Sequence, residues 1–142
     1  MSRTAAMTAL LLLMAPTAAL ADGDAALLGR WKTQKQGATV EIHRCGAALC
    51  GRVVDGLPLR ANPDQRDIRN RKASLRDRKI MNLRVLESFT GGPGQWTGGP
   101  VYDPDTGDGA PTGSITLVSQ DVIRLKGCLG PICRAQTWTR AR

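Results

Sequence analysis

Residues 39–55 read TVEIHRCGAALCGRVVD, and this stretch decides the fold class. Polar and apolar side chains alternate from Thr39 to Cys45, which is typical of a β-strand with one buried face. A second strand resumes at Gly51, after a loop whose two cysteines are separated by four residues. Facing Cβ atoms at the end of a β-hairpin come close enough to be bridged at this spacing. The stretch therefore predicts an antiparallel hairpin with a cysteine pair near its tip.

The rest of the chain continues as short strands separated by turns. We expect further strands near Trp31 and in the segments 83–89, 95–102, 114–119, 122–128 and 133–140. Residues 73–78 can form one or two helical turns, and no long apolar period of 3.6 residues favours another helix. About eight antiparallel strands in so short a chain predict an all-β barrel or sandwich, with at most a short helix near residues 73–78.

The length of 142 residues fits one domain, and we expect residues 22–142 to form it. One Phe, one Tyr and three Trp give its interior little aromatic bulk. An eight-stranded barrel can be filled by side chains or can hold one small ligand. The candidate core, or lumen lining, consists of aliphatic residues on the expected strands: Val40, Ile42, Val53, Leu83, Val85, Ile115, Leu117, Ile123 and Leu125.

Residues 1–21 have the layout of a secretory signal peptide. Arg3 supplies a basic start, residues 5–15 carry no charge, and Ala19-Leu20-Ala21 has the small residues of a cleavage site. The uncharged run is too short to span a membrane, which takes about 20 apolar residues. We therefore expect cleavage after Ala21, no transmembrane segment, and a mature protein in the periplasm or outside the cell.

Export favours disulfides over free thiols, and the four cysteines form two C-x4-C pairs. The spacing favours structural bridges Cys45–Cys50 and Cys128–Cys133. Two alternatives remain open: crossed pairing between the two hairpins, and a zinc site with four cysteine ligands. Zinc is disfavoured because structural sites usually contain C-x2-C pairs and an oxidising compartment removes thiolates.

Positive charge is concentrated between residues 60 and 84, where nine Lys and Arg accompany three Asp. Seven of the nine are Arg, which can bind a phosphate or carboxylate with two hydrogen bonds. One interpretation is a basic flap that meets an anionic group. The other is a solvated loop in which several arginines pair with Asp67, Asp77 or backbone carbonyl groups. The composition leaves both open.

Common catalytic motifs are absent from the sequence, including the nucleophile elbow, the zinc-protease motif, the P-loop and the dinucleotide fingerprint. His43, the only histidine, is expected on the polar face of a strand. Residues 103–108 resemble the start of a calcium loop, but Gly107 and Ser114 stand where an EF-hand needs oxygen ligands. We therefore expect no enzyme activity, no metal and no cofactor.

Gly29-Arg30-Trp31 resembles the Gly-x-Trp signature of the calycin superfamily, which includes lipocalins and fatty-acid-binding proteins. The resemblance implies that Gly29 and Trp31 lie at one end of a barrel and that an arginine of the last strand stacks on the tryptophan. Arg140 stands where that arginine would fall. A cation–π contact worth about 1–2 kcal/mol would then close the barrel. The lipocalin Thr-Asp-Tyr motif is missing.

A second resemblance covers nearly the whole chain after the leader. It rests on GRW (29–31), VEI (40–42), CG (45–46), LCGRVV (49–54), Asp67-x-x-Asn70, LRDR (75–78), Gly99, VYDP (101–104), GCLG (127–130) and QTWTR (136–140). Together these strings resemble domain-of-unknown-function family 2147, a family of exported bacterial proteins. The resemblance implies an eight-stranded, antiparallel up-and-down barrel similar to lipocalins, without an assigned reaction. The sequence departs from the family pattern at Lys79 and Asn82, and it has no Tyr after Gly107.

These observations favour a non-catalytic barrel that binds a small amphipathic or lipid-like anionic ligand. The arginines expected to bind the anionic group lie on the basic connection over the barrel mouth: Arg71, Arg76, Arg78 and Arg84. The alternative is an interaction module of the cell envelope with a packed interior and a basic partner-binding loop. Nucleic-acid binding is disfavoured because few aromatic side chains accompany the arginines. We expect a monomer by default.

Overall fold

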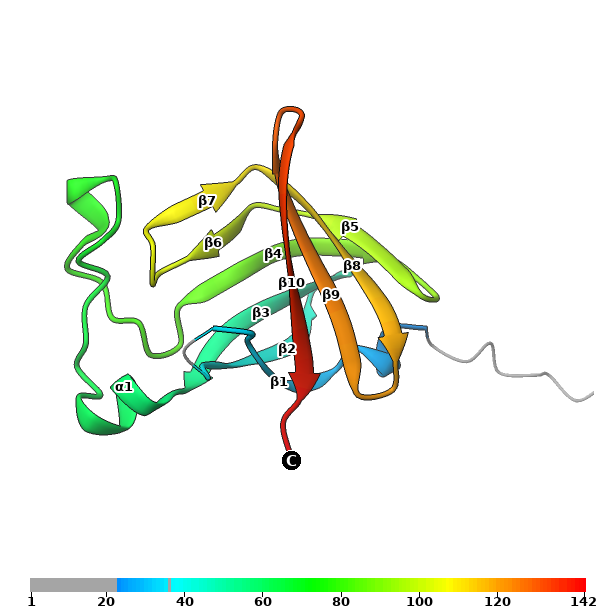
Figure 1. Cartoon of the computed structure of the whole chain (residues 1–142), viewed down its shortest axis with the longest axis horizontal. Helices are drawn as coiled ribbons and strands as arrows, with labels where there is room; N and C mark the ends of the chain where they lie inside the picture. The colour runs from blue at the N-terminus through cyan, green and yellow to red at the C-terminus, as the bar shows by residue number, and fades with distance from the viewer. Residues whose placement is uncertain (1–22, 36) are drawn as a thin grey trace, which may run out of the picture.

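A computed structural model of the chain describes residues 23–35 and 37–142 (Figure 1). The predicted signal peptide, residues 1–21, lies outside the described residues. Most of the described chain is β-structure. The elements in chain order are η1 (Gly23–Ala26), β1 (Gly29–Lys32), β2 (Thr39–Cys45), β3 (Ala48–Asp55), α1 (Leu57–Ala61), η2 (Ala73–Leu75), β4 (Arg84–Gly91), β5 (Gln95–Gly98), β6 (Val101–Asp103), β7 (Asp108–Ala110), β8 (Thr112–Ser119), β9 (Val122–Leu129) and β10 (Ile132–Arg140).

The strands close into a barrel in which every neighbouring pair is antiparallel. The hydrogen-bonded order β3-β2-β1-β10-β9-β8-β5-β4 is completed by pairing of β3 with β4. Strand β6 continues β5 beyond a kink, and β7 leads into β8. Strand β6 pairs with β4 on one side and with β7 on the other. At this kink a Cβ on Gly99 would overlap the carbonyl oxygen of Pro111, and Gly99 has a φ of +139°. Eight of the ten strands therefore form the closed barrel wall, which confirms the expected eight-stranded antiparallel fold.

The helical segments differ in part from the prediction. Residues 73–78 form a single 3-10 turn, Ala73–Leu75, followed by irregular backbone. A short helix, α1, forms instead at Leu57–Ala61, directly after β3. Pro58 lies in its first turn, where a missing N–H costs nothing, and Leu59 is buried. Five residues are too few for a helical apolar period, so the sequence pattern could not reveal this helix.

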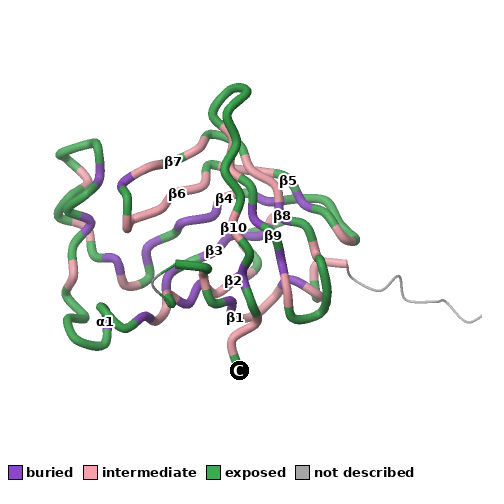
Figure 2. The backbone as a smooth tube through the Cα atoms, in the orientation of Figure 1, coloured by how far each residue is buried: buried purple, intermediate pink, exposed green. Residues whose placement is uncertain are grey.

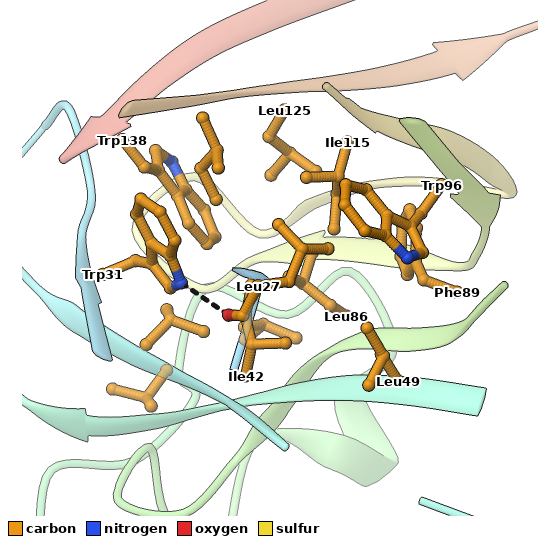
Figure 3. Close-up of a cluster of buried hydrophobic side chains, with 14 of the residues drawn as sticks. Leu27, Trp31, Ile42, Leu49, Leu86, Phe89, Trp96, Ile115, Leu125 and Trp138 are labelled. Atoms are coloured by element: carbon orange, nitrogen blue, oxygen red, sulfur yellow. Dashed lines mark hydrogen bonds between the residues drawn. The ribbon is translucent and has the colours of Figure 1, made fainter. Parts of the chain in front are cut away.

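The core is a single cluster of buried hydrophobic side chains inside the barrel (Figure 3). Eight of the nine predicted core residues are buried, and the ninth, Leu117, is half-buried. The bulkiest fully buried side chains are Trp31, Trp96 and Phe89. Burying aromatic groups of this size contributes more to stability than any aliphatic residue of the same core.

Both predicted disulfides are confirmed. Cys45 bonds Cys50 across the end of the β2–β3 hairpin, and Cys128 bonds Cys133 across the end of the β9–β10 hairpin. The crossed pairing and the four-cysteine zinc site are therefore excluded. Among the described residues, no helix is both long enough and apolar enough to cross a membrane.

Candidate functional site

One end of the barrel is sealed by the segment before β1. Trp31 is fully buried and donates its indole N–H to the carbonyl oxygen of Leu27 at 2.8 Å (Figure 3). Arg140, which is the Cα partner of Trp31 in the β1–β10 ladder, lies with its guanidinium 4.1 Å from the Trp31 ring centroid. The same guanidinium donates to the carbonyl oxygens of Ala26 at 2.7 Å and Leu28 at 3.1 Å. The first and last strands are thereby joined at a closed end of the barrel.

The opposite end of the barrel contains an open cavity of about 150 Å³. Its wall is mainly apolar and includes Val40, Val53, Val85, Leu86, Leu125 and Trp138. Four of the predicted core residues therefore face this cavity, and Trp138 forms part of its floor. Helix α1 and the connection that follows it lie together at this end of the barrel, which we call the mouth (Figure 1).

Residues 62–83 form an irregular strap at the mouth. The strap folds back on itself through the hydrogen bonds from the Asp67 amide to the Arg78 carbonyl oxygen at 3.0 Å and from the Ile80 amide to the Gln65 carbonyl oxygen at 3.0 Å. Most of its residues are exposed (Figure 2), yet Asp67 is fully buried. A buried carboxylate is tolerated only when it is paired and hydrogen-bonded.

Asp67 has three side-chain partners. Its carboxylate accepts hydrogen bonds from Tyr102 Oη at 2.5 Å, Arg78 Nε at 2.8 Å and Asn70 Nδ2 at 2.9 Å. The Arg78 guanidinium also lies 5.1 Å from the Tyr102 ring centroid. Burial, together with the neighbouring Asp67 carboxylate, raises the pKa of Tyr102 to about 12. Because Tyr102 belongs to β6, this cluster latches the strap to the barrel wall.

The turn between β6 and β7 supports the same attachment. Arg69 donates to the Asp105 carbonyl oxygen at 2.7 Å, and Arg71 pairs with the Asp108 carboxylate. A Cβ on Gly107, whose φ is +75°, would overlap the carbonyl oxygen of Arg69. Glycine is therefore required where the turn meets the strap.

None of the four arginines predicted to bind a ligand lines the cavity. Arg71 pairs with Asp108, Arg78 pairs with buried Asp67, and Arg84 pairs with Glu87 at 3.5 Å. Arg76 donates to the carbonyl oxygen of Asn70 at 2.8 Å. A ligand-binding role for these four residues stays a prediction, and in this structure each already has a protein partner.

Two other arginines of the same segment, Arg66 and Arg69, do line the mouth of the cavity. Each donates to a backbone carbonyl oxygen, of Asp77 and Asp105 respectively, and within the described chain neither has a carboxylate within 4.0 Å. Lys35 joins them in the lining. Sequence reasoning missed Arg66 and Arg69 because only the folded path of the strap decides which arginines point toward the opening.

Acidic groups at the mouth are partly compensated. Asp55 pairs with Arg60, whose guanidinium lowers the pKa of Asp55 to about 2. Burial and the neighbouring Asp103 raise the pKa of Asp105, which disfavours its charged form. Asp55, Asp103 and Asp105 thus line the mouth together with Lys35, Arg66 and Arg69, and of these acidic groups Asp55 has an arginine partner, Arg60, in an ion pair.

A second hollow, of about 660 Å³, adjoins the mouth. It lies between the β6–β7 hairpin and the inner face of β9 and β10, and it shares Lys35, Val101 and Leu125 with the cavity. Within the described part of the chain, no cluster of three or more His, Cys, Asp or Glu side chains could hold a metal ion. His43 lies half-buried on β2, with Nδ1 3.0 Å from the Arg44 carbonyl oxygen.

Comparison with known proteins agrees with this architecture. No curated protein is significantly similar to the chain. A solved structure described as protein HP1028 from the human pathogen Helicobacter pylori, belonging to the lipocalin family, is similar with a TM-score of 0.69 and 18% sequence identity. The likeness covers 82% of this chain and 83% of that one, and at this identity it shows the lipocalin-like fold. A family model described as "Uncharacterized protein conserved in bacteria (DUF2147)" matches residues 29–140. The chain therefore belongs to the DUF2147 family of uncharacterized proteins conserved in bacteria.

Proposed function

We propose that this protein is a non-catalytic binding barrel that holds the apolar part of a small, amphipathic, anionic ligand in its lumen. The observation that carries the proposal is the unequal filling of the barrel. The fully buried Trp31, Trp96 and Phe89 lie outside the cavity lining, whereas the opposite end of the barrel keeps a mainly apolar cavity that opens to solvent. Ligand sites are typically concave, mainly apolar and equipped with a few polar groups that orient the ligand.

The charge distribution at the mouth supports an anionic head group. Arg66 and Arg69 lie where the head group of a lumen-bound molecule would emerge, and their guanidinium groups have spare donors. Arginine binds carboxylates and phosphates with planar, two-point geometry. Arg71 and Arg78 are paired with carboxylates, whereas Arg66 and Arg69 each give one hydrogen bond to a backbone carbonyl oxygen and would offer their remaining donors to the ligand.

The proposal also includes export of the protein from the cytoplasm. The two disulfides fit an oxidising compartment, and the leader predicted at residues 1–21 would deliver the protein to the periplasm or the cell exterior. A barrel with a sheltered lumen would there carry or retain an amphiphile that water alone does not dissolve.

The test is a titration of delipidated protein with fluorescent fatty-acid and lysophospholipid probes, with Trp138 in the cavity floor as an intrinsic reporter. We expect micromolar or tighter binding. The double variant Arg66→Gln/Arg69→Gln should weaken anionic probes about tenfold while leaving an uncharged alcohol of equal chain length unaffected.

The matched control is Arg124→Gln/Lys126→Gln, which removes two cations from exposed positions of β9 outside both hollows. The control should bind every probe as the wild type does. The proposal fails if no amphiphile binds, and the charge argument fails if the control weakens binding as much as the mouth variant. The packed-interior alternative predicts the first of these results.

A further inference from the structure

The end of the β9–β10 hairpin, which we call the arm and define as residues 126–136, extends past its neighbours: β8 pairs with β9 only as far as Cys128, and β1 pairs with β10 only at Thr139 and Arg140. Figure 1 shows it projecting past the β6–β7 hairpin, and Figure 2 shows its tip as exposed. Leu129 and Ile132 at this tip are 65% and 69% exposed, although they are large apolar residues. The Cys128–Cys133 bond fixes the two strands of the arm to each other. The barrel closes through the pairing of β1 with Thr139 and Arg140, so the projecting arm and its apolar tip are not required for closure.

One edge of the arm has no strand partner. Residues 132–139 of β10 pair with β9 on one side, but on the other side β1 pairs only with Thr139 and Arg140. The chain turns away after Lys32, so among the described strands none covers residues 132–136 on that side. An open edge of this kind is a template for another strand, and proteins usually cover or blunt it.

The hydrogen-bonding groups on this edge can be identified. The Thr137 amide donates to Gln34 Oε1 at 2.8 Å, so the backbone N–H and C=O of Thr137 point away from β9. In an antiparallel ladder this direction repeats every second residue. Ala135 and Cys133 therefore present one N–H and one C=O each to the same open side. The Gln34 side chain occupies the place that the backbone carbonyl of a further strand would take.

The arm also supplies pockets for side chains of such a strand. Ile132, Arg134 and Gln136 of β10 line the hollow of about 660 Å³ between the arm and the β6–β7 hairpin. Within the described chain, Arg134 has no carboxylate within 4.0 Å, and neither does Lys35 at the rim of this hollow. Arg71, Asp103 and Asp108 also line this hollow, and Asp108 pairs with Arg71, so an acidic side chain opposite Arg134 would enter a hollow lined by three cations and two carboxylates.

We propose that the free edge of β10 binds an extended polypeptide segment of a partner protein, which adds as an antiparallel strand where β1 leaves the sheet. Main-chain hydrogen bonds to Cys133 and Ala135 would hold the segment. On its groove-facing side an acidic residue would lie opposite Arg134, and an aliphatic residue two positions later would lie opposite Ile132. The recognised pattern is acidic-x-aliphatic, read from the amino end of the segment.

The test uses the blocked peptide TTETVTT and its charge-reversed counterpart TTKTVTT, with amide hydrogen exchange of the folded protein followed by NMR. With TTETVTT in excess, exchange at Cys133 and Ala135 should slow at least about tenfold, because both N–H groups become hydrogen-bonded. TTKTVTT should bind about fivefold more weakly because it places a like charge opposite Arg134.

Two variants and one control complete the test. Arg134→Glu should reverse the preference, so that TTKTVTT binds better than TTETVTT. Arg124→Glu, the same charge change on the outer side of β9, should leave the preference as it is in the wild type. Ala135→Pro removes an N–H that points away from β9 and should abolish binding; an unchanged circular dichroism spectrum shows that the variant is folded.

Three results would overturn the proposal. The first is no protection of Cys133 and Ala135 at any soluble concentration of either peptide. The second is equal affinity for both peptides in wild type and in Arg134→Glu. The third is protection without peptide that disappears on dilution, since the occupant of the edge would then be a second copy of this chain. None of these outcomes depends on whether the lumen binds an amphiphile.

Discussion

Tyr102 offers a direct test of the latch because it is the only tyrosine of the chain. Burial and the Asp67 carboxylate raise its pKa from 10.0 to about 12. A difference of two units corresponds to a hundredfold change in the ionisation constant and to an upper bound of about 3 kcal/mol, which solvent screening of the partly buried side chain reduces. Because the pKa in the folded state is the higher one, this contribution to stability is complete below pH 10 and is lost as the pH rises through 12.

The assay is a titration followed by tyrosinate absorbance, with circular dichroism at each pH to show that the protein is still folded. The wild type should give a single transition near pH 12. In Asp67→Asn the pKa of Tyr102 should fall part of the way toward 10.0, because the negative charge is removed while burial remains. Asp67→Asn should also lose about 3 kcal/mol of unfolding free energy, since Arg78 loses its buried partner.

Glu41→Gln is the control for this titration. Glu41 pairs with Arg52 at 2.7 Å on the barrel surface and makes no contact with the latch. Its removal should leave the Tyr102 transition where it is in the wild type. A transition near pH 10 in folded wild-type protein, or one that Asp67→Asn does not move, would refute the assignment of Asp67 and Tyr102 as the latch.

Two further predictions concern the sealed end and the surface. Arg140→Met should lower the unfolding free energy by about 3 kcal/mol in urea titrations, because the cation–π contact and the donors to Ala26 and Leu28 are lost. The exposed control Arg124→Met should change it by less than about 0.5 kcal/mol, and equal losses in both variants would contradict the closure. For Asp55, whose pKa is lowered to about 2 by Arg60, the side-chain carbon resonance should titrate near pH 2 and move toward the ordinary value of 3.8 in Arg60→Gln. Since the folded pKa is depressed, this ion pair stabilises the protein above about pH 4 and stops doing so as the pH falls through 2. An unchanged transition in Arg60→Gln would show that the pair does not form.

The all-β architecture could be predicted because its signals are local. Alternation along residues 39–45 and the C-x4-C spacing both act within a few residues, so the β2–β3 hairpin and its disulfide follow from the sequence alone. The same holds for the β9–β10 hairpin. The resemblance at Gly29-x-Trp31 also predicted that the first strand lies beside the last strand where the barrel closes, and β1 does pair with β10.

The mouth could not be predicted because it depends on contacts between distant segments. Tyr102 meets Asp67 across 35 residues, and Arg71 meets Asp108 across 37. Composition identified residues 60–84 as basic but could not show which of the arginines form ion pairs with carboxylates of the same chain. The interpretation as an internally paired loop fits the contacts of this segment, since Arg66 and Arg69 also donate to backbone carbonyl oxygens, and the interpretation as a flap that meets an anionic group stays a prediction. Arg71 and Arg78 are paired, whereas Arg66 and Arg69 lie at the opening.

Native mass spectrometry of protein taken from its own cell envelope, without refolding, tests the ligand-binding proposal most directly. The proposal predicts a discrete mass above that of the mature chain, which solvent extraction removes and which Arg66→Gln/Arg69→Gln protein retains less well. A bare polypeptide mass in every preparation, with the cavity at Trp138 inaccessible to added amphiphiles, would contradict it.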